Sequence, residues 1–246
     1  MKHIIFKMGI EYPGYVIKLN SYLNYNVARI PDEYDDNRVE LKKLNAVVVP
    51  EQFARGFIFA DIYKDYVSIR TNSHIMDEFP DLATSGETDA EKVKYFLTDD
   101  DRELGVKFNK FVMLKVIADR FSERLKNLNV DASDLETATW EEQKREALSY
   151  QLDNTTTTPL IDILASGKGI DRSDLVAKIL SNVEAYKVKL ANLLVEQQQL
   201  EQRVKACQTI PECHRLKHEK FGVSMSYQQQ LDENIETSPL TLKMDF

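Results

Sequence analysis

The sequence predicts an α+β protein, with a small, mostly antiparallel β-rich N-terminal domain followed by a helical module with a long heptad-patterned helix. Three observations support this prediction. Short runs rich in Val, Ile, Phe and Tyr alternate with turn residues up to about residue 72. Apolar residues recur at helical spacing farther along the chain. Only 8 glycines occur among 246 residues, which suits long helices and few tight loops.

The N-terminal domain, placed at residues 1–100, should contain several short strands. Turn signals such as Pro13-Gly14 and Arg55-Gly56 separate its apolar runs. The expected strands occupy residues 3–7, 15–19, 26–30, 46–49, 57–60 and 63–70. The aromatic residues of this region could contact protein or glycan, but a role in the core is favoured.

A connecting helix is predicted over residues 101–128, after a polar connection at 73–103 that includes a short helix near 89–96. Its apolar residues keep a heptad-like spacing: Phe111, Leu114, Ala118, Phe121, Leu125 and Leu128. The acidic run 99–101 would cap the N-terminus of this helix and offset its dipole. A polar linker at 129–139 then marks the domain boundary.

The helical module, residues 140–210, should begin with two shorter helices. Thr139 and Glu142 have the spacing of a capping box for a helix that extends to about residue 150. Thr158-Pro159 supplies an N-cap and a proline at the first position of the second helix. The long helix follows.

The long helix has an unbroken heptad register from about residue 174 to residue 207. Its a and d positions form one narrow seam, which a second helix would cover. The seam residues are Val176, Ile179, Val183, Tyr186, Leu190, Leu193, Gln197, Leu200, Val204 and Cys207. Pro211 ends the pattern, and residues 211–246 are predicted to be a polar C-terminal tail that is ordered only if something holds it.

The pattern does not identify the helix that covers this seam. It could be another helix of the same chain, in an antiparallel hairpin or bundle, or a second copy of the chain. The additional apolar residues Leu180 and Leu194 widen the stripe, which favours more than two helices around it. Gln197 is a polar residue in the middle of the seam, where it would either fix the register or mark a loose, hydrated position.

The sharpest candidate for a metal site is the set Cys207, Cys213, His214 and His218. Two thiols and two imidazoles are suitable zinc ligands, but the spacing fits no known zinc class. Cys207 also occupies a d position, where it would pack as a small apolar group. We therefore predict no metal site here, with a metal-binding regulatory protein as the alternative.

No other residue pattern points to catalysis or to a cofactor. Gly167-Lys168-Gly169 lacks the remainder of a phosphate-binding loop and is better explained as a helix end. The aspartates of 35–36, 99–101 and 131–134 occur in polar loops without a nucleophile, and His3 and His74 stand alone. We expect no catalytic residues, no cofactor and no enzymatic activity.

Composition narrows the range of partners. The net charge of −8 and the absence of long basic runs argue against nucleic acid and anionic membranes. No stretch approaches the ~20 apolar residues of a membrane span, and the N-terminal apolar run is too short for a signal peptide. We therefore expect the chain in cytoplasm, with both cysteines reduced.

The helical module resembles one that recurs toward the C-termini of tailed-bacteriophage tail proteins, including tail-fibre and tail-fibre-assembly proteins. The resemblance covers about residues 139–209. It lies in WEEQ at 140–143, TPLIDILA at 158–165, GI at 169–170, LVAKI at 175–179 and QQQL at 197–200. Val195-Glu196 stands where these proteins tend to have a glycine, so the long helix should be continuous here.

The resemblance implies a non-enzymatic structural or adaptor protein of a phage virion, associated with the tail, baseplate or tail fibre. Its partners would be other tail, baseplate or fibre proteins, and a second copy of the chain is a further candidate. The protein would occur in the host cytoplasm during assembly and in the mature particle. An assembly chaperone that is absent from the mature particle is the alternative within phage biology.

Overall fold

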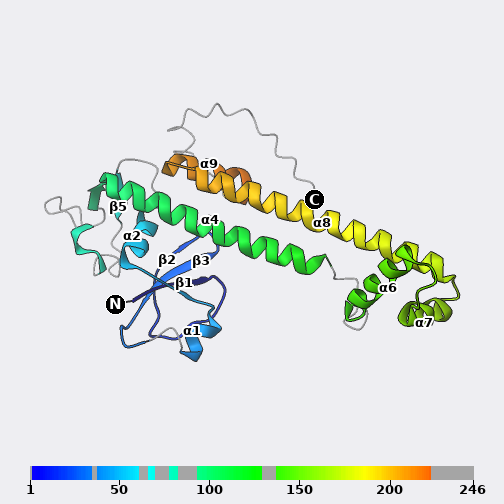
Figure 1. Cartoon of the computed structure of the whole chain (residues 1–246). Helices are drawn as coiled ribbons and strands as arrows, with labels where there is room; N and C mark the ends of the chain where they lie inside the picture. Colours follow the sequence, from blue (N-terminus) through cyan, green and yellow to red (C-terminus); the bar gives the residue numbers. More distant parts are fainter. Residues whose placement is uncertain are drawn as a thin grey trace, which may run out of the picture. The chain divides into compact units, whose positions relative to one another are not determined.

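The computed structural model describes residues 2–34, 38–60, 66–69, 78–82, 93–128 and 137–222. The chain divides into two compact units: unit 1 comprises residues 1–116 and 201–246, and unit 2 comprises residues 117–200. The long helices α4 (Asp99–Asn127) and α8 (Arg172–Ala206), labelled in Figure 1, contribute residues to both units. The predicted α+β class is confirmed, whereas unit 1 extends beyond the β-rich domain expected at 1–100.

An antiparallel sheet of four strands forms the base of unit 1. The strands β1 (Lys2–Lys7), β2 (Ile17–Tyr22), β3 (Tyr25–Ile30) and β4 (Val47–Val49) lie in the order β2-β3-β1-β4. Four predicted strands are therefore confirmed. The central strand β1 pairs with both β3 and β4, and its residues 3–6 are buried.

Both faces of the sheet are covered, which explains why the central strands β1 and β3 are buried along most of their length. On one face, Ile4 and Ile30 pack with Leu41 of the short helix α1 (Val39–Lys43) and with Leu44, which follows this helix. On the other face, the ring of Tyr22 lies 5.6 Å from that of Phe108 on α4. The hydrophobic effect thus fixes α1 and α4 to opposite faces.

The strand predicted at 57–60 is wrong, because these residues belong to the helix α2 (Glu51–Phe59) and its C-cap Ala60. The misleading signal was Arg55-Gly56, which resembled a turn. A methyl group at Gly56 would lie 2.7 Å from the carbonyl oxygen of Leu104, so this glycine permits close approach of α2 and α4. Gly56 therefore serves helix packing.

The strand predicted at 63–70 is confirmed as β5 (Tyr66–Ile69), and positions 63–65 and 70 lie outside the described residues. It pairs with β6 (Val93–Phe96) in a separate antiparallel sheet. The helix predicted near 89–96 is therefore wrong at 93–96, where a pairing strand was available, and 89–92 lie outside the described residues. The short 3₁₀ helix η1 (Pro80–Leu82) falls between these strands in sequence.

The C-terminal tail predicted from residue 211 is wrong over its first part, because α9 (Ile210–Phe221) is a helix. Thr209 and Glu212 form a complete capping box, and Pro211 occupies the first turn, where proline starts a helix as readily as it ends one. Cys213, Leu216 and Phe221 of α9 are buried. Residues 223–246 lie outside the described residues.

Unit 2 contains the C-terminal part of α4, the helices α6 (Trp140–Leu152) and α7 (Pro159–Lys168), and most of α8. Its core consists of Ala147, Ile161, Ala165, Leu175, Val176 and Ile179. Gly169 ends α7 in the left-handed conformation, with a φ of 63°. The three predicted helices are thus present, and α8 is continuous. None of the helices in the described part of the chain is long and apolar enough to cross a membrane.

The capping box predicted at Thr139 and Glu142 is not formed. Thr139 has α-helical backbone angles and makes no side-chain capping hydrogen bond. Instead, the Gln143 side-chain amide donates a 2.8 Å hydrogen bond to the Thr139 hydroxyl oxygen. The polar linker predicted at 129–139 is described only from residue 137 onward.

Candidate functional site

The predicted seam is the face of α8 that the chain itself covers, although its middle is only partly buried. In unit 2, Val176 and Ile179 pack against α6 and α7, and Leu193 is 9% exposed. Val183, Tyr186, Gln197 and Leu200 are half-buried, whereas Leu190 is 39% exposed. In unit 1, Val204 and Cys207 are buried.

Within unit 2, the helix opposite the middle of the seam is α4. The Arg124 Nη1 and Glu196 Oε1 atoms lie 2.8 Å apart, and this hydrogen bond lowers the pKa of the Glu196 carboxyl. A cleft of about 370 Å³ is lined by Arg124, Asn127, Leu128, Lys189, Asn192, Leu193 and Glu196. A helix of the same chain, α4, thus lies opposite this part of the seam.

Glu146 is a structural residue of unit 2 that the sequence did not reveal. Glu146 is 7% exposed, and its carboxylate accepts hydrogen bonds from the backbone N–H groups of Leu160, at 3.2 Å, and Ile161, at 2.9 Å. It therefore caps α7 from α6. The predicted N-cap, Thr158, makes no side-chain capping hydrogen bond. A glutamate next to the apolar Ala147 was the only local hint that Glu146 is buried. Nothing near it in the sequence indicates that its partner is the backbone of Leu160, 14 residues away.

The opposite side of α8 exposes an apolar stripe, which we call the outer stripe: Val188, Ala191, Leu194 and Val195. The exposed fractions of Val188, Leu194 and Val195 are 51%, 52% and 49%. The spacing of 188, 191 and 195 places three of these residues along one line of the helix. Leu194, predicted to widen the seam, belongs to this exposed face.

The cysteines and histidines of 207–218 contribute to the packing of unit 1. Cys207 and Cys213 are both buried free thiols, and burial raises the pKa of Cys213 to about 12. The His214 Nε2 atom lies 2.9 Å from the carbonyl oxygen of Ala60, the C-cap of α2. Among the described residues, no group of three or more His, Cys, Asp or Glu has a metal-binding arrangement.

A buried polar network joins four elements of unit 1. The Tyr22 hydroxyl on β2 donates to the Asn109 side-chain oxygen on α4, and Lys217 on α9 donates to the same hydroxyl. The Asn109 amide donates to the carbonyl oxygens of Ala60, at 2.9 Å, and Gly105, at 2.8 Å. Each of these polar groups thus has a partner within the fold, which accounts for its burial.

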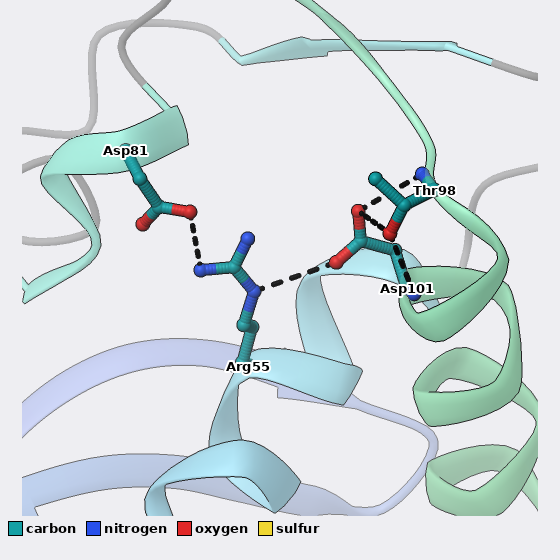
Figure 2. Close-up of polar contacts among 4 residues, drawn as sticks. All are labelled: Arg55, Asp81, Thr98 and Asp101. Carbon is teal, nitrogen blue, oxygen red and sulfur yellow. Dashed lines mark hydrogen bonds and ion pairs between the residues drawn. The ribbon is translucent and has the colours of Figure 1, made fainter.

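Charged side chains also hold the segment 78–82 in unit 1. Figure 2 shows Arg55 between Asp81, with an N–O distance of 2.7 Å, and Asp101, at 3.5 Å. Asp101 also forms reciprocal capping hydrogen bonds with Thr98. The acidic run 99–101 therefore forms the first turn of α4, and of its three residues Asp101 takes part in the cap, with Thr98 as the N-cap residue. Arg55 is the partner that the sequence did not indicate.

His3 is not isolated, contrary to the sequence-based prediction. Its Nε2 atom lies 2.7 Å from the Glu78 carboxylate, which also pairs with Arg29 at 2.8 Å. His74 and the aspartates of 35–36 and 131–134 lie outside the described residues. These contacts of Glu78 connect β1 and β3 to the segment 78–82.

Comparison of the chain with models of known protein families, with curated proteins and with solved structures found no match.

Proposed function

We propose that this chain is a non-enzymatic structural or adaptor protein of a tailed-bacteriophage virion, associated with the tail, baseplate or tail fibre, and that it acts by helix-mediated contact. The resemblance of residues 139–209 to phage tail proteins supports the setting. The observation that carries the mode of action is the outer stripe of α8.

The outer stripe supports a contact role on energetic grounds. Apolar surface favours burial by roughly 25 cal/mol per Å². A surface helix therefore usually keeps one polar face, but over residues 188–195 α8 is apolar on both its covered and its exposed side. Exposed apolar patches on folded proteins commonly mark interaction sites. A protein partner would cover this one.

Cross-linking with mass spectrometry in infected cells tests the proposal, because the exposed Lys187 flanks the outer stripe. Lys187 should form cross-links to tail, baseplate or fibre proteins. Lys42 and Lys43 on α1 in unit 1 are matched controls and should form few such links. Absence of links from Lys187 to any other phage protein would contradict the proposal.

The same experiment separates a virion component from an assembly chaperone. If the chain belongs to the virion, it should be detected in purified particles with the same cross-links. If it is a chaperone, the links should occur in the lysate and the chain should be missing from particles. Both roles use the same contact surface of α8. They differ in whether the chain stays bound to its partner in the finished particle or is released before the particle is complete.

A further inference from the structure

We propose that Cys207 and Cys213 join in an intramolecular disulfide under oxidising conditions, and that this bond fastens the helix α9 to the end of α8. The inference does not depend on the proposed function, because the two cysteines belong to unit 1 and the outer stripe belongs to unit 2. It is carried by the placement of two buried thiols at either end of one short turn.

The turn between α8 and α9 brings the two thiols into contact. Cys207 is the first residue after α8, and Cys213 is the fourth residue of α9. The Cys207 thiol donates to the carbonyl oxygen of Arg203 at 3.5 Å, and the side chains of Cys207 and Cys213 are hydrogen-bonded to each other. Two thiols in such contact need only a small side-chain shift to reach bonding distance.

The turn is held by its own hydrogen bonds, so the two thiols remain adjacent in the folded chain. The Glu212 carboxylate accepts from the backbone N–H groups of Gln208, at 2.6 Å, and Thr209, at 3.2 Å. The Thr209 hydroxyl oxygen accepts in turn from the Glu212 N–H, at 3.3 Å. The loss of chain entropy that closing a disulfide loop requires has therefore largely occurred on folding.

The bond would stabilise the docked position of α9. This helix packs in unit 1 through noncovalent contacts, among them His214 with the carbonyl oxygen of Ala60 and Lys217 with the Tyr22 hydroxyl. A disulfide at its first turn removes the detached conformations in which the two cysteines lie far apart. Oxidation therefore favours the state in which α9 is docked.

The reaction is thiol–disulfide exchange with a low-molecular-weight disulfide, for which oxidised glutathione is the probe. Cys207 is 8% exposed and Cys213 is 0% exposed, so the Cys207 thiolate attacks first and one glutathione thiolate leaves with the electrons of the broken S–S bond. The Cys213 thiolate then attacks the Cys207 sulfur and releases the second glutathione. The chain loses two hydrogens and the oxidant gains two. Burial raises the pKa of both thiols, which makes the exchange slow at neutral pH.

Redox equilibrium of the purified full chain in mixtures of reduced and oxidised glutathione tests the bond. Samples that start reduced and samples that start oxidised should reach the same end point, so slow access to the buried thiols does not affect the result. Alkylation in denaturant followed by mass spectrometry counts the free thiols. We expect the folded chain to favour the intramolecular disulfide at least roughly tenfold more than the same chain in guanidinium chloride, where the turn is lost.

Cys207→Ser and Cys213→Ser are the matched controls. Each keeps one thiol and should form only a mixed disulfide with glutathione. In the wild type, hydrogen exchange at the amides of Leu216 and Lys217 should be slower in the oxidised chain than in the reduced one, because a fold that favours the bond is stabilised by it.

A disulfide no more favourable in the folded chain than in denaturant would overturn the inference. A mixed disulfide with glutathione, or a disulfide between two chains, as the end product in the wild type would overturn it as well. The experiment involves neither the outer stripe nor any other phage protein, so these outcomes leave the proposed function to its own test.

Discussion

At the scale of single residues, Asn109 stands at the centre of the fold of unit 1. It is fully buried, accepts from the Tyr22 hydroxyl and donates to two backbone carbonyls. A buried polar group without a partner costs about 1–3 kcal/mol. Sequence alone could not identify this role, because the three partners come from β2, the end of α2 and α4 itself.

We expect Asn109→Ala to lower the free energy of unfolding by about 2–3 kcal/mol, since it leaves the Tyr22 hydroxyl buried without its acceptor. Glu103→Gln, at an exposed position of the same helix, should change it little. Urea denaturation measures both. Equal stability of Asn109→Ala and the wild type would contradict the network.

Cys213 should make stability depend on alkaline pH. Burial raises its pKa from 9.0 to about 12, so the unfolded chain releases this proton at lower pH than the folded chain. The stabilisation that the protonated Cys213 thiol contributes to the folded chain is fully present below pH 9 and is lost as the pH rises toward 12.

Between pH 8 and pH 10.5, the wild type should lose about 1–2 kcal/mol more unfolding free energy than Cys213→Ser. Both are measured by urea denaturation. The lysines and tyrosines titrate in both proteins, so their contribution to the pH dependence cancels in the comparison. The same pH dependence in the two proteins would show that the thiol is not shielded.

At the scale of elements, sequence periodicity predicted the long helices well. The heptad spacing of residues 176–207 identified the covered face of α8, and the spacing of 111–128 identified α4. These signals are local, because apolar side chains at helical spacing define a face whatever covers it. Four strands of the sheet were predicted from another local signal, short runs rich in Val, Ile, Phe and Tyr between turn residues.

The missed elements depend on distant contacts. The sequence of α2 contains aromatic residues and Gly56, which are typical of a strand and a turn. The glycine is explained only by the close packing of α4 against α2. The residues of α9 are mostly polar, and their burial needs a surface made by α2, α4 and β2. Lys217, for example, is 1% exposed although lysine is ordinarily a surface residue.

Glu146 provides a test at this scale. Glu146→Ala should destabilise unit 2 by about 2 kcal/mol and speed hydrogen exchange at the amides of Leu160 and Ile161, which lose their acceptor. Glu141→Ala, on the same helix and exposed, is the control. Unchanged protection of these two amides would refute the capping role.

At the scale of the whole molecule, residues 201–222 of the C-terminal region belong to the same compact unit as the N-terminal sheet. The predicted boundaries at 100 and 129–139 did not anticipate this, since a sequence shows which face of a helix is buried and not which distant segment buries it. Most of the seam predicted along α8 lies on its covered face, although Leu190 is 39% exposed. The outer stripe on the opposite side was recognised only through burial.

The central claim is that the outer stripe of α8 is covered when the protein performs its function. The rate at which maleimide labels Val195→Cys measures this directly, because Cys207 and Cys213 are buried and react little. In native assemblies from infected cells, labelling should be at least tenfold slower than in the dilute purified chain, while the control Lys42→Cys reacts at the same rate in both. Equal labelling of Val195→Cys in the two states would contradict the claim.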